Sequence, residues 1–334
     1  MLFLGSLASR VVTKLDSIVA NFRCHVFAES TKRTYQNYLK SYRRFCELIH
    51  IPLVPLSDVN LARYVAYLSG RLQYNSIANY LSIVRLLHAE AGLVSPLDTH
   101  YTNTVLTGAK RVLGCKVSSK LPITPKILLY IFELISLHDS KQLCFWAACL
   151  VAFFSFLRKS NLFPRSAVHF DANHQISREH VIFNPTGVCL NVLKTKTIQF
   201  SERTLKIPLP RIPDSPMCPA KAIMLNFKQV PAVSSPSPLF LYLSENGAQV
   251  LTYPKFISLL KHFLQRLGYN SSLYSGHSFR RGGATFALEC GIPADFIQSQ
   301  GDWKSNAYKN YLDPSFTHRQ TVMNKFASAL QNLK

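Results

Sequence analysis

The sequence predicts a mainly α-helical protein that carries a small antiparallel sheet. Long segments place apolar residues at three- and four-residue spacing, the pattern of amphipathic helices. The stretch 180–210 instead contains short β-prone runs, two of them separated by the turn sequence Asn-Pro-Thr-Gly at 184–187. At 334 residues the chain exceeds the size of one typical domain. We therefore expect two domains, with the sheet in the second.

The first third of the chain is predicted to form a helical domain. Apolar residues recur at helical spacing in four consecutive segments, which are 30–50, 57–68, 75–92 and 101–114. Ser30 is predicted to cap the first of these helices, and Ser57 precedes the second. The stretch 114–125 is polar and basic and contains two prolines. We therefore predict a domain at 1–114, a linker at 115–125 and a second domain at 126–334.

The second domain is predicted to change from helix to sheet and back to helix. Its apolar run 143–157 has 15 residues, fewer than the ~20 needed to cross a bilayer, and it is predicted to form a buried helix. The β-prone runs are 167–170, 180–183, 187–200 and 204–210. Helical patterns return at 219–227, 253–268, 280–291 and 293–303, and they continue through 305–313 to a C-terminal segment at 316–334. The second domain is therefore predicted to be mixed α+β.

The chain is strongly basic, with 38 Lys and Arg against 17 Asp and Glu and a formal net charge of +21. Residues 1–115 carry 13 basic and 6 acidic side chains, so both predicted domains share the excess. Clustered cations favour a polyanion, because binding releases counterions from a phosphate backbone. We found neither a membrane-spanning run nor a basic segment ahead of the apolar N-terminus. We therefore expect an intracellular protein that binds a polyanion and no membrane, and both domains have the excess charge expected if they hold double-stranded DNA between them.

The sequence contains no pattern for a metal, a nucleotide or a disulfide framework. Its eight cysteines include no C-x-x-C pair, and its histidines form no H-E-x-x-H motif. Glycine fingerprints for nucleotide phosphates are also absent. We therefore expect reduced cysteines and no cofactor.

The stretch Gly-His-Ser-Phe-Arg-Arg-Gly-Gly at 276–283 concentrates hydrogen-bond donors in two turns. Alone, it could be ordinary basic surface with His277 as a helix cap. The side chains of Arg280 and Arg281 project about 100° apart on a helix, so the two cannot bind the same phosphate equally well. The two glycines lower helix propensity but permit close approach of a neighbouring backbone or helix.

Other motifs lie before and after this stretch in a specific order. Arg158 lies in Phe-Leu-Arg-Lys-Ser-Asn-Leu and Lys196 in Leu-Lys-Thr-Lys-Thr, while Trp303 ends Gly-Asp-Trp and Tyr311 lies in Asn-Tyr-Leu. With His277-x-x-Arg280, the set resembles the tyrosine recombinase, or phage integrase, family over most of the chain. The motifs are especially similar to those of crypton-type transposon and DIRS-group retroelement recombinases.

The resemblance implies a helical core-binding (SAM-like) domain followed by a mixed α+β catalytic domain. It implies the catalytic residues Arg158, Lys196, His277, Arg280, Trp303 and Tyr311. We assign DNA contacts to Arg43, Arg44, Lys194 and Arg281. Lys194 also competes with Lys196 as the catalytic lysine, since two residues apart on a strand share a face. One departure is Asn161, where many relatives carry an acidic residue that supports the first arginine.

Each of these residues suits metal-free phosphodiester cleavage. Arginine forks match non-bridging phosphate oxygens, where charge builds in the transition state. A histidine can move a proton near neutral pH, the indole N–H can bond the phosphate, and a lysine can protonate the leaving 5′ oxygen. Tyr311, eight residues after Trp303, fits the family's spacing for the nucleophile better than Tyr308. Each residue also has a purely structural alternative. Arg158 could be a surface cap, Trp303 a core side chain, and Lys196 a solvated lysine.

The resemblance implies an enzyme that breaks and rejoins DNA through a 3′-phosphotyrosyl bond, for excision and integration of a mobile element. It also implies a tetramer on two DNA sites, and a nuclear location in a eukaryotic host. The apolar stripe Val322, Phe326, Ala329 and Leu330 is predicted to dock the C-terminal tail on a neighbouring subunit, with docking on its own domain as the alternative. A type IB topoisomerase and a retired transposase that only binds DNA remain as alternative functions.

Overall fold

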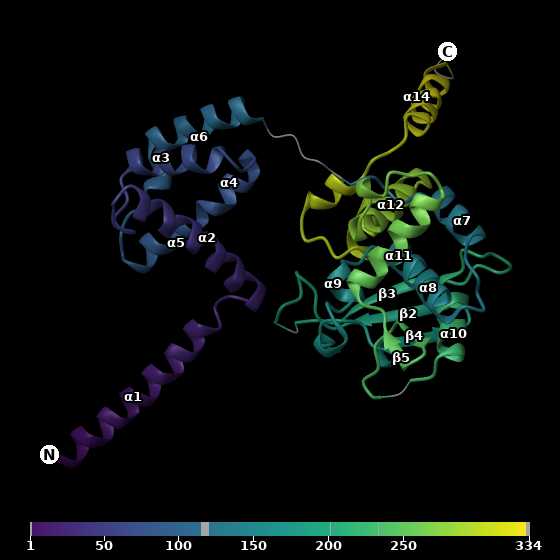
Figure 1. Ribbon diagram of the computed structural model, residues 1–334, viewed down its shortest axis with the longest axis horizontal. Helices are drawn as coiled ribbons and strands as arrows, with labels where there is room; N and C mark the ends of the chain where they lie inside the picture. The colour runs from purple at the N-terminus through teal and green to yellow at the C-terminus, as the bar shows by residue number, and fades with distance from the viewer. Residues whose placement is uncertain (1, 115–119, 201, 233, 332–334) are drawn as a thin grey trace. The chain divides into compact units, whose positions relative to one another are not determined.

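The structure is a computed structural model that describes residues 2–114, 120–200, 202–232 and 234–331 (Figure 1). The chain divides into two compact units, residues 1–118 and 119–334. Of the predicted linker 115–125, residues 115–119 lie outside the described residues. The backbone amides of Leu121 and Ile123 donate hydrogen bonds to the carbonyls of Leu273 and Ser278. The end of the predicted linker is therefore part of the second unit.

The first unit is helical throughout its described length. Its helices are α1 (Leu2–Cys24), α2 (Glu29–Leu48), α3 (Asp58–Ser69), α4 (Tyr74–Tyr80), α5 (Ser82–Glu90) and α6 (His100–Leu113). A core of aromatic and aliphatic side chains joins α2 to α5, with Tyr42, Phe45 and Tyr64 in ring contact at its centre. Ser57 caps α3, because its side chain accepts a hydrogen bond from the Asn60 amide.

Three details of this unit differ from the prediction. Helix α2 begins at Glu29 after Ala28, so Ser30 lies inside it and does not cap it. The predicted helix 75–92 is divided into α4 and α5 at Leu81. Helix α1 was not predicted, and apolar side chains such as Leu15 and Phe22 are exposed along it. Its apolar residues recur at helical spacing from 11 to 22, so the sequence carried a signal for this helix that the prediction did not use.

The second unit mixes helices with two small sheets. Its helices are α7 (Pro125–Glu133), α8 (Ser140–Ser155), α9 (Lys159–Leu162), α10 (Pro219–Gln229), α11 (Tyr253–Arg266), α12 (Gly276–Glu289), α13 (Ala294–Gln300) and α14 (Phe316–Gln331). Its strands are β1 (Val181–Asn184), β2 (Gly187–Val192), β3 (Leu205–Pro210), β4 (Leu241–Ser244) and β5 (Gly247–Val250). The predicted fold class, mainly helical with small antiparallel sheets, is confirmed.

The sheets correct the predicted strand positions. Strands β1, β2 and β3 form one antiparallel sheet, and β4 and β5 form a separate hairpin that was not predicted. The predicted strand 167–170 is instead a 3-10 turn at Ala167–His169. Strand β2 ends at Val192, so both Lys194 and Lys196 lie in the connection to β3 and not on a strand.

Helix α8 is the centre of the second unit and is buried on nearly every side. It packs against α10, α12, β3 and β4 (Figure 1). Its apolar run therefore fills a protein core, and no helix in the described part of the chain is long and apolar enough to span a membrane.

The two glycines of α12 bring that helix unusually close to its neighbours. A Cβ at Gly282 would collide with the Ile123 carbonyl, and a Cβ at Gly283 would collide with the Phe153 carbonyl and the Phe156 ring. The predicted close approach is confirmed. It fixes α12, which carries His277 and Arg280, against α8 and residue 123.

Candidate active site

Arg280 is the most deeply buried of the predicted site residues, with 1% of its surface exposed. Its Nη1 donates to the Phe156 carbonyl, and its Nη2 donates to the Gly301 carbonyl at 2.8 Å. Its guanidinium lies 3.6 Å from the centre of the Trp303 ring and 5.1 Å from that of Tyr311. The arginine thus joins the end of α8, the segment after α13 and the tyrosine segment in one place.

Local structure explains this position. Phe156 ends α8 in the left-handed conformation at φ 51°, which takes the chain away from the helix axis. Helix α12 begins with a capping box, in which Ser275 and Ser278 each accept a hydrogen bond from the other's backbone amide. Arg280 therefore lies in the second turn of a firmly started helix, one residue after the buried Phe279.

Burial lowers the pKa of Arg280 to about 9, with a further decrease from the neighbouring Arg158. The neighbouring Tyr311 and Asp302 raise the pKa of Arg280 and so partly offset this decrease. The guanidinium still carries its charge at neutral pH. It is therefore a buried cation whose Nε has no hydrogen-bond partner in the described structure.

Trp303 and Tyr311 lie against this arginine. Trp303 is 6% exposed, and its Nε1 is buried without a partner among the described residues. Its ring centre lies 5.3 Å from that of Tyr311. Gly301 makes room for the indole, because a Cβ there would overlap the Trp303 ring. An unpaired indole N–H beside a buried guanidinium is suited to an anionic ligand.

The two candidate tyrosines differ in burial. Both lie in a 3-10 helix at Asn306–Tyr311, where the prediction expected α-helix. In a 3-10 helix residues three apart eclipse one another, so both face Trp303. Tyr308 is 6% exposed and packs in a small core with Phe156 and Ile297, whereas Tyr311 is only partly buried.

His277 lies beside the same tyrosine, with 6.3 Å between the ring centres of His277 and Tyr311. His277 is exposed, yet desolvation lowers its pKa below the usual value. The neighbouring cations Lys159, Arg280 and Arg158 lower it further. The imidazole is therefore neutral at neutral pH and able to accept a proton.

Arg158 was predicted to end the long apolar helix, but α8 ends at Ser155 and Arg158 is the N-cap residue of α9. Its guanidinium has no hydrogen-bond or ion-pair partner among the described residues. Its charge lowers the pKa of both His277 and Arg280, which places it near them. Five of the six predicted catalytic residues thus meet in one site: Arg158, His277, Arg280, Trp303 and Tyr311.

The sixth predicted residue, Lys196, lies in the connection between β2 and β3, where its side chain is exposed. The ammonium groups of Lys194 and Lys196 have no hydrogen-bond partner in the described structure. Asn161 stands where many relatives carry an acidic residue that supports the first arginine, and its side chain makes no hydrogen bond to Arg158 in the described structure. Its side-chain amide instead donates to the Lys194 carbonyl at 2.7 Å and to the His174 carbonyl at 3.2 Å.

Sequence reasoning missed one residue of this region. Asp302 is 4% exposed and accepts hydrogen bonds from Thr195, Thr197 and Arg203. Its position inside the Gly-Asp-Trp motif was visible, but no periodicity or spacing connects it to a loop about one hundred residues earlier.

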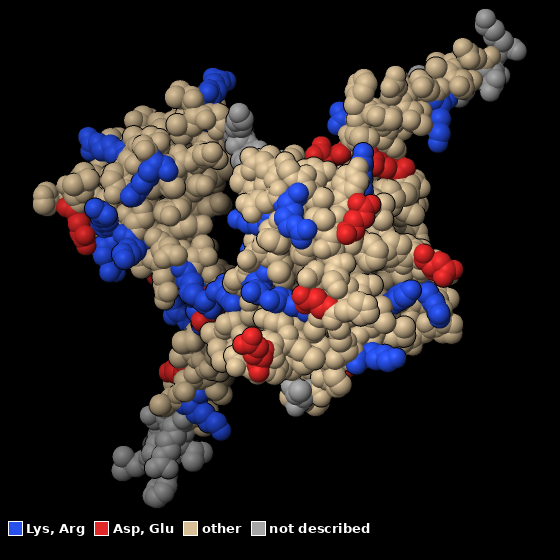
Figure 2. Space-filling view, turned by 45° about the vertical axis from the view of Figure 1, so that its right-hand side comes forward, with Lys and Arg blue, Asp and Glu red and all other residues tan. Residues whose placement is uncertain are grey.

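The residues assigned to DNA contacts have different surroundings. Arg281 is largely buried and forms an ion pair with Asp313, 3.1 Å apart, so its guanidinium has an intramolecular partner. Arg43 and Arg44 are exposed on α2. Figure 2 shows Lys and Arg side chains on the visible face of both units, with fewer acidic ones.

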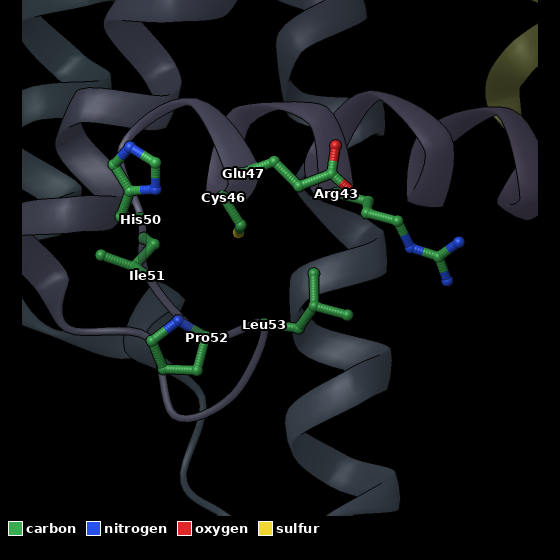
Figure 3. Close-up of a pocket in the computed structure, with 7 residues that line it drawn as sticks. All are labelled: Arg43, Cys46, Glu47, His50, Ile51, Pro52 and Leu53. Atoms are coloured by element: carbon green, nitrogen blue, oxygen red, sulfur yellow. The ribbon is translucent and has the colours of Figure 1, made fainter.

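A shallow hollow of about 590 Å³ lies at the end of α2. Seven residues line it: Arg43, Cys46, Glu47, His50, Ile51, Pro52 and Leu53 (Figure 3). The Arg43 guanidinium points away from His50 and Pro52 (Figure 3). The hollow contains none of the predicted catalytic residues. Among the described residues, no cluster of His, Cys, Asp and Glu could hold a metal ion.

Comparisons with known proteins agree with the motifs. No protein-family model matches the chain. Its sequence is 22% identical over 304 residues to an integrase/recombinase XerD homolog of Selenomonas ruminantium, which covers 89% of this chain and 85% of the relative.

Solved structures share the fold at low sequence identity. The Tn1549 transposon integrase in complex with transposon right end DNA aligns over 92% of this chain and 98% of its own, with a TM-score of 0.58 and 16% identity. XerH bound to palindromic difH substrate aligns over 90% of this chain and 79% of its own, with a TM-score of 0.58 and 13% identity. The chain thus shares its fold with the Tn1549 transposon integrase and XerH and is similar along most of its length to an integrase/recombinase, in agreement with the resemblance to the tyrosine recombinase, or phage integrase, family that its motifs carry.

Proposed function

We propose that the chain is a site-specific recombinase that breaks and rejoins double-stranded DNA through a 3′-phosphotyrosyl bond to Tyr311. One observation carries this proposal. The partly buried Tyr311 ring lies beside Arg280 and Trp303, whose buried N–H donors remain free in the described structure. His277 and Arg158 complete a group that combines a phenol, a proton acceptor and two guanidinium groups.

The proposed step is an in-line displacement at phosphorus. The Tyr311 oxygen forms a bond to phosphorus while the bond from phosphorus to the 5′ oxygen breaks. The neutral His277 accepts the phenol proton, and Lys196 gives a proton to the leaving oxygen. Arg158, Arg280 and the Trp303 indole hold the non-bridging oxygens, which gain charge in the transition state.

Rejoining is the same reaction in reverse. A 5′-hydroxyl attacks the phosphotyrosyl bond, and Tyr311 leaves as a phenol. The energy of the original phosphodiester is kept in the covalent bond to the protein, so no nucleotide is needed. Attack by a hydroxyl from a second duplex gives recombination.

Duplex DNA is the proposed partner. Relatives of this fold were solved in complex with transposon DNA, with a difH substrate and, for lambda integrase, with a COC′ core site. The net charge of +21 supports the same partner. Arg43 and Arg44 are exposed cations on the α2 face opposite Tyr42 and Phe45, where they can contact a phosphate backbone.

We propose assembly as a tetramer on two DNA sites, with the tail docked on an adjacent subunit. Helix α14 exposes apolar side chains, with Val322 49% and Leu330 52% exposed. The side chains of Phe326 and Ala329, the other two members of the predicted stripe, lie outside the described residues. An exposed apolar stripe favours burial against another surface. Mobile-element excision and integration, in the nucleus of a eukaryotic host, fit the motif resemblance.

The test is to trap the covalent intermediate. The full chain is incubated with duplex fragments that tile the DNA flanking its own coding sequence, and the products are denatured and resolved by size. A protein–DNA adduct that protease treatment removes supports strand cleavage by the protein. Four-way junctions on paired sites indicate a recombinase, relaxation of one supercoiled circle without junctions indicates a topoisomerase, and binding without any adduct contradicts the proposal.

A further inference from the structure

We propose that Asp302 and Asn161 are positioning residues that hold the lysine-bearing segment 194–197 in place for proton donation to the leaving oxygen. This inference rests on the proposed function, because it assigns a role within the cleavage step. It concerns a part of the site that the predicted catalytic residues leave unexplained. Lys196 lies in a loop, and a loop must be fixed before its side chain can act as a positioned acid.

Asp302 holds one side of this segment. Its Oδ2 accepts hydrogen bonds from the hydroxyls of Thr195, at 2.5 Å, and of Thr197. Its Oδ1 accepts from Nη2 of Arg203 at 2.6 Å, near the start of β3. Both threonines flank Lys196 directly in the chain. A single carboxylate therefore binds the segment before and after the lysine.

The Asp302 side chain is 2% exposed, so its charge is removed from water. A buried carboxylate is tolerated when it is paired and hydrogen-bonded. Its partners here come almost entirely from the loop. Asp302 also adopts a left-handed backbone conformation at φ 52°, which aspartate and asparagine tolerate better than most residues. Trp303 follows Asp302 directly in the chain, so the hydrogen bonds of Asp302 connect the loop to the backbone next to Trp303.

Asn161 holds the other side. It is 4% exposed, and its amide group donates to the carbonyl of Lys194 at 2.7 Å. Its backbone amide bonds the Arg158 carbonyl, and its own carbonyl accepts from the Ile176 amide. Asn161 thus links the segment to the short helix that follows Arg158.

The segment also has internal order. The Thr195 hydroxyl accepts from the backbone amides of Thr197 at 3.0 Å and of Ile198 at 3.0 Å, and Ile198 is fully buried. Hydrogen bonds thus hold backbone groups on both sides of Lys196, while its side chain is exposed. That arrangement is suited to a lysine whose stem begins at a defined point and whose ammonium must reach a bound substrate.

Asp302 can also affect cleavage in a second way, through Arg280 and not through the lysine-bearing segment. Its charge also raises the pKa of Arg280 and so helps to keep that guanidinium charged. A defect in an Asp302 variant could therefore come from the arginine and not from the lysine. The two routes differ in chemistry, because only the lysine serves the leaving oxygen.

A substrate with sulfur in place of the bridging 5′ oxygen separates them. In this duplex the Tyr311 oxygen still bonds to phosphorus, but the bond that breaks leaves a thiolate. Thiols are far more acidic than alcohols, so this leaving group needs no proton from lysine. The probe is the flanking-DNA duplex that gives the wild-type adduct, synthesised with oxygen or with sulfur at the cleaved position.

We expect Asp302→Asn to lower the rate of adduct formation on the oxygen substrate by about 10²-fold, the size of a lost general acid. On the sulfur substrate the rate should return to within about tenfold of wild type, as for Lys196→Ala. The double variant Thr195→Val and Thr197→Val keeps the side-chain volumes and should behave in the same way. Asn161→Ala should also be rescued by sulfur.

Asp313→Asn is the matched control, because it makes the same chemical change on the Tyr311 side of the site and touches no residue of the loop. Asp313→Asn should slow adduct formation by the same factor on the oxygen substrate and on the sulfur substrate. Equal losses for Asp302→Asn on oxygen and sulfur would overturn the proposal in favour of the Arg280 route. An unchanged rate on oxygen would overturn it as well.

A measurement without DNA keeps this inference separate from the proposed function. Hydrogen exchange of the full chain should be faster at 194–198 in Asp302→Asn than in wild type, while exchange in α8 stays the same. Unchanged exchange at 194–198 would contradict the positioning role. If wild type forms no adduct with either substrate, the proposed function fails, and the exchange result still decides whether Asp302 holds the loop.

Discussion

Arg281 and Asp313 form an ion pair, 3.1 Å apart, that ties the segment carrying Tyr311 to helix α12. One turn further along α12, the Thr285 hydroxyl donates to the Tyr311 carbonyl and accepts from the Asp313 amide. Another turn on, Glu289 accepts from the Ser315 amide. Residues four apart lie on one helical face, so a single stripe of α12 holds the tyrosine segment. That stripe belongs to the same helix as Arg280.

The first prediction concerns this ion pair. Arg281→Gln and Asp313→Asn should each slow adduct formation about tenfold, because the Tyr311 backbone loses one of its supports to α12. DNA affinity should change little in either variant. The double variant should be no slower than the singles, since both remove the same interaction.

The comparison of the two single variants also tests the sequence-based assignment of Arg281 to DNA. If Arg281 contacts a phosphate, Arg281→Gln weakens DNA binding and flattens its salt dependence, whereas Asp313→Asn does neither. Binding measured at several salt concentrations for both variants separates the two roles.

The second prediction concerns the glycines of α12. A Cβ at Gly282 has no room beside the Ile123 carbonyl, so Gly282→Ala should lower the free energy of unfolding by about 1–3 kcal/mol. Both tryptophans, Trp146 and Trp303, lie in the second unit, so urea unfolding followed by tryptophan fluorescence reports on this change.

Gly108 is the matched control in helix α6 of the first unit. A Cβ there meets nothing within 4 Å, and the backbone is helical. Gly108→Ala should therefore raise the free energy of unfolding of its unit by about 0.5–1 kcal/mol, which far-UV circular dichroism can follow. Equal effects of the two substitutions would contradict the close packing of α12.

The third prediction concerns pH. Desolvation and nearby cations lower the pKa of His277 in the folded protein, so below about pH 6.5 the unfolded chain binds this proton more readily. Its contribution to stability is therefore full above that pH and is lost as the pH falls toward the folded pKa. Wild type should lose more stability on acidification than His277→Gln, which has no such proton to gain.

The measurement is the thermal midpoint of both proteins between pH 7.5 and pH 5, in about half-unit steps across the window in which an unperturbed histidine titrates. Other titrating groups are common to both proteins and cancel in the difference. A difference that stays constant over the whole range would show that the pKa of His277 is the same in the folded and unfolded chains.

The parts of the site that were predictable from sequence are those with a local signal. His277 and Arg280 share one helix, and Trp303 and Tyr311 are close in sequence, so short motifs with fixed spacing carried the resemblance from which they were predicted. Helix α8 was predictable for the same reason, since an uninterrupted apolar run needs burial on all sides.

The parts that were missed depend on tertiary contacts. Thr195 and Asp302 are 107 residues apart, and neither residue type signals its partner. The β4–β5 hairpin had the turn residues Asn246 and Gly247, but four-residue strands give too short an alternation to recognise. The β-prone run continues past Val192, so the sequence left Lys196 on a strand or a hairpin, and the hydrogen bonds of this segment to Asp302 and Asn161 gave no sequence signal.

The last prediction distinguishes the two tyrosines of the segment Asn306–Tyr311. Tyr308 is 6% exposed and its ring is packed in the small core with Phe156 and Ile297. Tyr311 is partly buried, beside Arg280, Trp303 and His277. A phenol with a pKa near 10 becomes an effective nucleophile only where positive donors stabilise the developing oxyanion. Only Tyr311 has that environment.

Tyr311→Phe should therefore abolish the covalent adduct and leave DNA affinity almost unchanged, because the ring contacts remain and only the attacking oxygen is lost. Tyr308→Phe removes a hydroxyl from the neighbouring ring of the same segment and serves as the control, with adduct formation still detectable. Mass spectrometry of the protease-digested adduct should find the nucleotide remnant on the peptide that contains both tyrosines, and fragmentation should place it on Tyr311. A remnant on Tyr308 would mean that the segment refolds on DNA and that the burial of Tyr308 does not persist in the cleaving complex.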